Sequence, residues 1–95
     1  MVYKNFTNNI IKRNKEVVFT ELDDEVCLFS PEKGEYLNLN KTGSKIWNFL
    51  DKPTQIGIII ELLKTEYEGN SKNIEFNTES FIKDGLQKEI FKIIK

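Results

Sequence analysis

Few residues in this chain have side chains suited to chemistry. The sequence contains no histidine, the most common general base and neutral metal ligand in proteins, and its single cysteine is Cys27. One thiol cannot build a thiolate metal site. Asp23 and Asp24 form an adjacent carboxylate pair, but "LDDE" is typical of a tight turn, where successive side chains point apart. We therefore expect no catalytic residue and no metal site.

The glycines show no phosphate-binding pattern. They are scattered, and no spacing among them would bring several backbone N–H groups onto one anion: Gly34, Gly43, Gly57, Gly69 and Gly85. Together with the missing bases and metal ligands, this predicts that the chain is not an enzyme, needs no cofactor and works by binding.

The chain has 95 residues, which suffice for one domain with one small core. Charge is distributed unevenly along it. The net charge is −1, from 14 Lys and Arg against 15 Asp and Glu. Residues 1–15 hold four bases (Lys4, Lys12, Arg13 and Lys15) and no acid, which leaves 10 bases against 15 acids, or −5, for residues 16–95. Such an acidic body is a poor electrostatic match for nucleic acid, so we expect no nucleic-acid partner.

We accordingly divide the chain into a basic N-terminal arm, residues 1–15, and a folded domain, residues 16–95. The arm is expected to be solvated, and a basic arm that grips nucleic acid or a membrane is the alternative. No apolar run approaches the length that spans a bilayer, and "MVYKNFTNNIIKRNK" lacks the continuous apolar stretch of a signal peptide. These features predict a cytoplasmic protein without a membrane partner.

The first half of the domain has the pattern of a β-meander. Three short runs rich in β-branched, aromatic and aliphatic residues are separated by the turn sequences "LDDE" and "SPEKGE": Val17–Glu21, Val26–Phe29 and Glu35–Leu39. Pro31 fits the first corner of a turn, and Gly34 fits a position that needs a positive φ. We expect three antiparallel strands with the third at an edge.

The second half predicts three helices. Asn40 is a plausible N-cap for a first helix whose apolar face repeats at helical spacing and which ends at "DKP": Gly43, Ile46, Trp47 and Leu50. A second helix is expected from about Thr54 to Gly69, and a third lies somewhere between Ile74 and Lys92. The fold class is therefore α+β and winged-helix-like, with a three-stranded antiparallel meander followed by three helices.

The predicted edge strand raises a functional question. "EYLNL" contains neither Pro nor Lys, which commonly protect an exposed edge from further pairing. Two interpretations stay open: the edge is short or shielded by a helix, or an extended peptide adds to it as a further strand. Strand addition needs an apolar groove, and the last helix carries more apolar residues than one core contact requires.

One motif crosses the junction between the third strand and the first helix. It reads "G-x-Y-x-x-L-N-x-x-G-x-x-I-W" and is matched by these residues: Gly34, Tyr36, Leu39, Asn40, Gly43, Ile46 and Trp47. With this motif as its most specific part, the stretch from Val17 to Ile94 resembles the PqqD-like family. The family includes stand-alone recognition elements for ribosomally made, modified peptides, for example in lasso peptide pathways. The resemblance implies a non-catalytic protein that binds the leader segment of a precursor peptide. It also implies presentation of that leader to a modifying enzyme, such as a leader protease, a cyclase or a radical enzyme.

The resemblance places the leader as an added strand between the third strand and the third helix. On that basis the peptide-binding residues are expected to be Glu35, Tyr36, Leu37 and Asn38 on the strand, with Phe81, Ile82, Gly85, Lys88 and Glu89 on the helix. Alternation along the strand makes Leu37 inward-facing and Tyr36 accessible. Gly85 either leaves a notch for a bulky leader side chain or is a tolerated helix glycine.

Two other classes of protein remain as alternatives. A winged-helix transcription regulator would read DNA with its last helix. From Ile74 onward, however, four acids balance four bases: Glu75, Glu79, Asp84 and Glu89 against Lys83, Lys88, Lys92 and Lys95. A purely structural adaptor or dimerisation subunit would bind no peptide.

Overall fold

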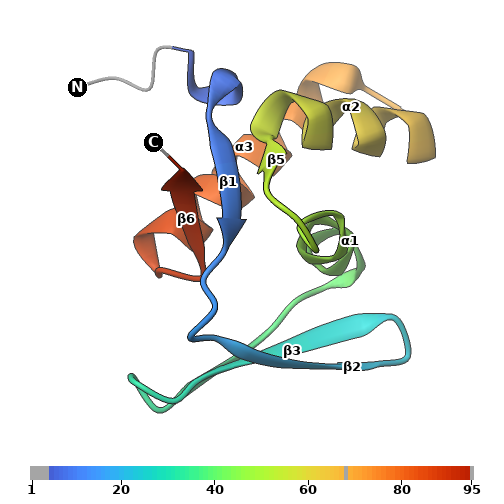
Figure 1. Cartoon of the computed structure of the whole chain (residues 1–95). Helices are drawn as coiled ribbons and strands as arrows, with labels where there is room; N and C mark the ends of the chain where they lie inside the picture. The colour runs from blue at the N-terminus through green and yellow to red at the C-terminus, as the bar shows by residue number, and fades with distance from the viewer. Residues whose placement is uncertain (1–4, 68, 95) are drawn as a thin grey trace.

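The structure of the protein is a computed structural model that describes residues 5–67 and 69–94. Its elements in chain order are η1 (Phe6–Asn8), β1 (Ile10–Arg13), β2 (Val18–Leu22), β3 (Glu25–Ser30), β4 (Glu35–Asn38), α1 (Lys41–Phe49), β5 (Thr54–Gln55), α2 (Ile56–Glu66), α3 (Ser71–Gln87) and β6 (Phe91–Ile94). The antiparallel meander followed by three helices is confirmed. Strand β1 precedes this unit, β6 follows it, and the short strand β5 separates α1 from α2 (Figure 1).

The strands form two antiparallel sheets. One has the order β2-β3-β4 and lies at the base of the molecule in Figure 1, with α1 packed on it. The other has the order β5-β1-β6 and stands beside the helices. A single apolar core joins both sheets and the helices, and Trp47 on α1 is fully buried within it.

Turn residues set the register of the meander as expected. Asp23 and Asp24 have φ values of 54° and 67°, which Asp tolerates better than most residues and which suits a tight hairpin turn. They link the pair Leu22 and Glu25. Gly34 has a φ of 67° at the end of the turn between β3 and β4. Glycine adopts this conformation without the steric cost of a Cβ.

Helix α1 begins and packs as the sequence predicts. The Asn40 side chain accepts a hydrogen bond from the Gly43 N–H at 2.8 Å, and the predicted apolar face is buried. Ser44 adds a contact that the pattern did not indicate: its Oγ accepts from the Val26 N–H at 2.8 Å and donates to the Leu39 carbonyl at 3.3 Å. This hydroxyl fixes α1 to the sheet just where β4 ends.

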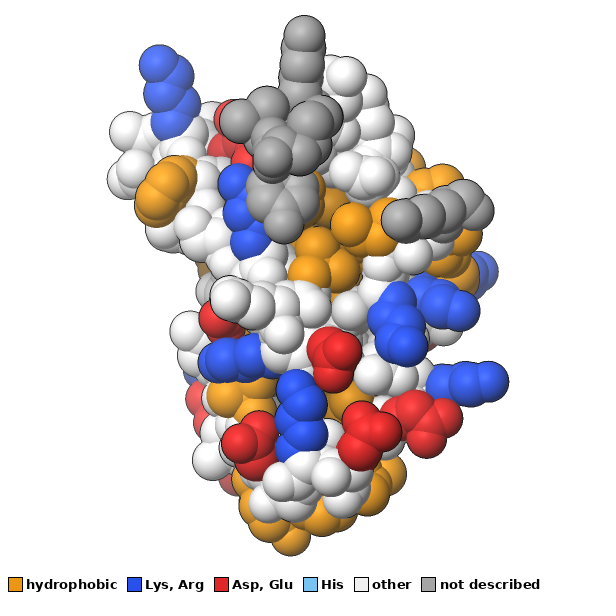
Figure 2. Space-filling view, turned by 90° about the vertical axis from the view of Figure 1, so that its left-hand side faces the viewer, with side chains coloured by type: hydrophobic (Ala, Val, Ile, Leu, Met, Phe, Trp, Pro, Cys, Tyr) orange, Lys and Arg blue, Asp and Glu red, His pale blue; other side chains and the backbone are white. Residues whose placement is uncertain are grey.

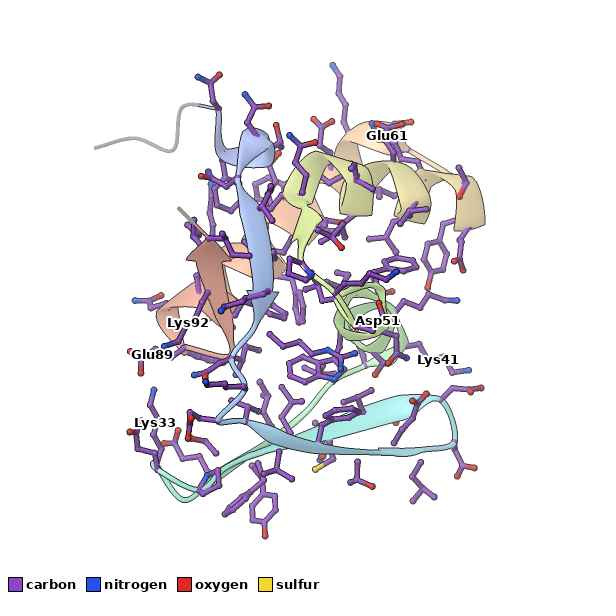
Figure 3. All side chains as sticks on the ribbon, in the orientation of Figure 1. Lys33, Lys41, Asp51, Glu61, Glu89 and Lys92 are labelled. Carbon is purple, nitrogen blue, oxygen red and sulfur yellow. The ribbon has the colours of Figure 1, made fainter. Side chains whose placement is uncertain are left out.

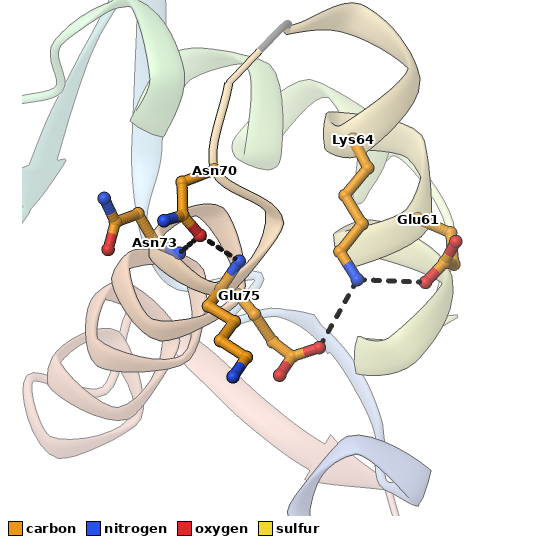
Figure 4. A network of polar contacts seen from close by, with 6 residues as sticks. Glu61, Lys64, Asn70, Asn73 and Glu75 are labelled. Atoms are coloured by element: carbon orange, nitrogen blue, oxygen red, sulfur yellow. Dashed lines mark hydrogen bonds and ion pairs between the residues drawn. The ribbon is translucent and has the colours of Figure 1, made fainter.

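Helix α2 buries one apolar face and also contacts α3 through polar groups. Its buried residues are Ile56, Ile59, Ile60 and Leu63. Lys64 Nζ lies 3.4 Å from Glu75 Oε2 on α3 and 3.6 Å from Glu61 Oε2 (Figure 4). Asn70 caps α3 by accepting from the N–H groups of Lys72 and Asn73. The two helices are thereby held side by side.

The end of α3 differs from the prediction. The helix stops at Gln87, Glu89 takes a φ of 66°, and Ile90 and Phe91 turn back into the core at the start of β6. The Ile90 N–H bonds the Gly85 carbonyl at 2.9 Å, and the Glu89 N–H bonds the Leu86 carbonyl at 3.1 Å. This is the Schellman ending, in which a left-handed residue reverses the chain. The helix therefore begins at Ser71, before the expected range, and ends at Gln87, so Ile90 and Phe91 lie outside it.

The expected solvated arm is also wrong for the described part of residues 1–15. Phe6 and Ile11 are buried, and β1 is the middle strand of its sheet, paired with both β5 and β6. The Arg13 guanidinium donates to the Trp47 carbonyl at 2.7 and 3.1 Å. Partial burial lowers the pKa of Arg13, and the nearby Asp51 carboxylate opposes this shift. Residues 1–4, including Lys4, lie outside the described residues.

Within the described ranges, no helix has the length and apolar character needed to cross a membrane.

Candidate functional site

Strand β4 has one open edge. It pairs with β3, and no other strand of the described residues pairs with its second side. The strand is four residues long, and the chain then passes directly into the cap of α1. Strand β2 forms the opposite edge of the same sheet. The predicted edge position of the third strand is therefore confirmed.

The direction of each backbone group on β4 follows from one hydrogen bond. The Leu39 N–H donates to the Val26 carbonyl at 2.8 Å, so these two residues form a hydrogen-bonded pair. Such pairs alternate with non-hydrogen-bonded pairs along an antiparallel ladder. In the observed register, Leu37 therefore bonds toward β3, whereas the N–H and C=O groups of Tyr36 and Asn38 face the open edge.

The side chains of β4 alternate as predicted. Leu37 is half-buried against the core and Leu39 is buried, while Tyr36 is 74% exposed. The Tyr36 ring packs on Phe29 of β3 with ring centroids 4.6 Å apart. The strand thus directs one face into the protein and the other into solvent, while its backbone edge stays open.

A cavity of about 400 Å³ lies beside the open edge. Its apolar lining comes from Val17, Leu28, Leu37 and Ile90, and its polar lining from Ser30, Lys33, Glu35, Tyr36 and Lys88. These residues belong to β3, β4, the turn between them and the segments before β2 and after α3. The cavity therefore offers an apolar site for a side chain next to backbone groups that need partners.

Ionic contacts at one end of the cavity join the β3–β4 turn to the end of α3. Lys33 Nζ lies 3.6 Å from Glu89 Oε1 and donates to the Lys88 carbonyl at 3.2 Å. Figure 3 shows Lys33 just below Glu89 on this side of the molecule. Lys88 Nζ is in turn 3.1 Å from Asp84 Oδ2. Both ion pairs are solvent-exposed, so they orient this rim more than they stabilise the fold.

A second hollow of about 250 Å³ lies past the other end of β4. Its lining comes from the start of α1 and the middle of α3: Asn40, Thr42, Gly43, Ile46, Asn77, Thr78 and Phe81. The first cavity borders Glu35 and Lys88, and the second borders Asn40 and Phe81. The two hollows thus follow β4 and α3 in opposite chain directions. We refer to the two hollows, together with the open edge of β4 between them, as the β4–α3 groove.

Most of the expected peptide-binding residues lie along the β4–α3 groove. Glu35, Tyr36, Leu37 and Lys88 line the first cavity, Phe81 lines the second hollow, Asn38 lies on the open edge between them, and Glu89 holds Lys33 at the rim. Lys33, Ile90 and Val17 also line the first cavity and were not predicted from the sequence. The sequence carried no signal for Ile90, because its position depends on the reversal at Glu89.

Ile82 and Gly85 do not line the groove. Both are buried, and Ile82 belongs to the core. A Cβ at Gly85 would lie 2.6 Å from Phe91 Cε2 and 3.1 Å from Ile90 Cγ1. The hypothesis that Gly85 leaves a notch for a leader side chain is therefore wrong, because Phe91 already fills this space.

These features define a small winged-helix-like domain whose open sheet edge borders an apolar groove. Residues 25–90 match the family described as coenzyme PQQ synthesis protein D (PqqD), and the chain belongs to this family. The family resemblance seen in the sequence is thereby confirmed. No significant match was found among curated proteins.

A solved structure has a similar fold over nearly the same extent. It is described as TbiB1 in complex with the TbiA(beta) leader peptide. The sequences are 28% identical, the match covers 85% of this chain and 94% of the other, and the TM-score is 0.79. The similarity therefore extends over almost the whole of that chain.

Proposed function

We propose that this chain binds the leader segment of a ribosomally made precursor peptide by strand addition to β4. The protein is non-catalytic and presents the bound precursor, in the cytoplasm, to a modifying enzyme such as a leader protease, a cyclase or a radical enzyme. Family membership and the similarity to a leader-bound protein support the class of ligand. The domain of residues 16–95 supplies the β4–α3 groove, and β1 supports it from the core.

The observation that carries the proposal is the open edge beside an apolar cavity. An added strand would pair with the outward N–H and C=O groups of Tyr36 and Asn38 and would gain main-chain hydrogen bonds independent of leader sequence. Selectivity would come from alternate leader side chains. Those directed inward would enter the cavity formed by Leu28, Leu37 and Ile90.

The polar rim suggests how the leader is oriented. Lys33 and Lys88 lie at the end of the groove near Glu35, and both are partly occupied by intramolecular ion pairs. A leader carboxylate would compete with Glu89 or Asp84 for these ammonium groups. An exposed ion pair can be replaced by another at small energetic cost. We therefore expect these lysines to influence the register of the bound leader more than its affinity.

Amide hydrogen exchange tests the proposal directly. The gene neighbourhood is first searched for a short precursor peptide. Its synthetic leader is then added to the full chain, and amide protection is compared with that of the free protein. We expect new protection at Tyr36 and Asn38, whose N–H groups face the open edge, and little change at Leu37, which already bonds toward β3.

Two results would contradict strand addition at β4. One is leader-dependent protection confined to β2, the other edge of this sheet, or to α2. The other is the absence of any leader binding in a titration that reaches millimolar peptide, which would favour a structural adaptor. The proposed presentation role requires in addition that the modifying enzyme processes the precursor faster when this chain is present.

A further inference from the structure

The outer face of the β2-β3-β4 sheet carries an apolar row, of which only Tyr36 also borders the leader-binding site. The inner face packs on the core, whereas alternation places Val18, Phe29 and Tyr36 on the opposite side. The register sets these residues side by side, with Val18 opposite Phe29 and Phe29 opposite Tyr36. We call this set the outer row.

The two ends of the outer row are open to solvent, and Phe29 between them is half-buried. Val18 is 56% exposed and Tyr36 is 74% exposed, although both are large and apolar. Figure 2 shows hydrophobic side chains gathered at the lower end of the molecule, where this sheet lies. Single exposed apolar residues are ordinary, but a contiguous row across three strands is typical of an interaction surface.

The segment that carries the row is acidic, which restricts what this sheet can bind. Residues 16–38 contain seven acids and one base, a net charge of −6: Glu16, Glu21, Asp23, Asp24, Glu25, Glu32 and Glu35 against Lys33. Alternation places Glu25 on the outer face itself, and the single base is held by Glu89. A second copy of this chain would bring two such acidic surfaces together, which is electrostatically unfavourable.

We infer that the outer row is a docking surface for the enzyme that processes the precursor, through an apolar patch bordered by Lys and Arg. This inference rests on the proposed function. The row ends at Tyr36, on the strand to which the leader is proposed to add, so an outward leader side chain would extend it. An enzyme docked there contacts both the sheet and the bound leader, which links recognition of the leader to delivery.

Matched substitutions test this surface. The probe is the purified processing enzyme encoded beside the precursor, and its affinity for the full chain is measured by calorimetry. Val18→Lys removes the apolar side chain and places a base against a basic border, so we expect affinity to fall at least about tenfold. Val18→Glu should weaken binding less than Val18→Lys, because a carboxylate faces the same border favourably.

Phe76→Lys is the control, because Phe76 is 70% exposed on α3, a helix that packs mainly on α2 and β6. It should leave enzyme affinity within about twofold, since peripheral substitutions contribute little. Leader affinity should be unchanged in all three variants, because Val18 lies on β2, with β3 between it and the open edge of β4. Unchanged leader affinity also shows that each variant is folded.

Three outcomes would overturn the inference: no loss of enzyme affinity in Val18→Lys, an equal loss in Phe76→Lys, or a greater loss in Val18→Glu than in Val18→Lys. Self-association of the chain that Val18→Lys abolishes, without enzyme binding, would instead assign the row to a second copy. Failure of the proposed function is distinguishable, because wild-type protein would then bind no leader whether or not the enzyme docks on the outer row.

Discussion

Glu89 occupies a backbone conformation that glycine adopts more easily. Its φ of 66° places a Cβ where L residues are strained, typically by about 1–3 kcal/mol. The strain is maintained because the reversal inserts Ile90 and Phe91 into the core and satisfies the last helix carbonyls. One residue therefore links the end of α3, the second sheet and the rim of the groove.

Replacing Glu89 by Gly should stabilise the protein by about 0.5–1 kcal/mol, because the strain is relieved while the exposed ion pair to Lys33 contributes little. Urea unfolding measures the change. Lys33→Ala is the control, since it removes the same ion pair and leaves the backbone unchanged. A Glu89→Gly variant no more stable than Lys33→Ala would show that relief of the backbone strain contributes nothing.

Gly85 is required by packing and has no positive φ. Gly85→Ala gains about 1 kcal/mol of helix propensity, but the new methyl group overlaps the buried ring of Phe91, and overpacking of this kind costs about 1–3 kcal/mol. We expect a net loss of stability in urea unfolding. In a Phe91→Leu background the same substitution should be neutral or stabilising. An equal loss in both backgrounds would contradict the steric explanation.

At the scale of elements, β4 depends on its neighbours on one side and is open on the other. The Ser44 hydroxyl joins β3 and the end of β4 to α1, and the ladder to β3 uses only alternate backbone groups of the strand. The strand is therefore fixed in place on one side, while its outward N–H and C=O groups stay available for pairing. Such a prepared edge lowers the ordering cost of adding a strand.

A proline scan of β4 separates the two sides of the strand. Tyr36→Pro and Asn38→Pro remove outward N–H groups, so leader affinity should fall about fivefold to tenfold per lost bond, while the free protein loses little stability. Leu37→Pro removes a bond to β3 and should destabilise the fold. Leader titration and urea unfolding measure the two effects. Equal effects at all three positions would refute the assigned directions.

Elements with local signals were predictable, and those defined by distant partners were not. The Asp23–Asp24 turn, the Asn40 cap and the α1 stripe each depend on residues close in sequence, and all three are present. Strand β1 has only four residues, and its partners are β5 and β6, which lie more than forty residues away. The prediction for this segment therefore followed the basic residues around Ile10 and Ile11, which indicated a solvated arm, and the strand was not predicted.

The same distinction applies to the candidate site. Alternation predicted the inward Leu37 and the accessible Tyr36, because strand geometry alone decides them. The α3 side of the groove was less predictable. Ile82 and Gly85 lie on the buried face, while Ile90 reaches the groove after the chain reverses. A single left-handed residue moved this wall of the site, and nothing in the apolar pattern indicated it.

At the scale of the whole molecule, acidic and basic residues are concentrated in different segments, although these segments share one apolar core. The β2-β3-β4 sheet region is strongly acidic, and the basic segment that includes Arg13 packs on α1 through the Trp47 carbonyl. The last helix and strand carry acids and bases in balance. Among the described residues, the β2-β3-β4 sheet and α3 therefore offer no extended basic face for DNA. The bases Lys12, Arg13 and Lys15 gather instead with Lys52 around a hollow beside Trp47 and Asp51.

Salt dependence should distinguish the two classes of ligand. A leader held by backbone pairing and apolar contacts should lose only a small part of its affinity between 50 and 200 mM salt, measured by calorimetry. A DNA complex with about six phosphate contacts would lose about 10³-fold over the same range, because each contact releases condensed counterions. Duplex DNA titrated in parallel provides the comparison. Micromolar DNA binding with this steep slope, together with no leader binding, would replace the leader-binding proposal with the transcription-regulator alternative.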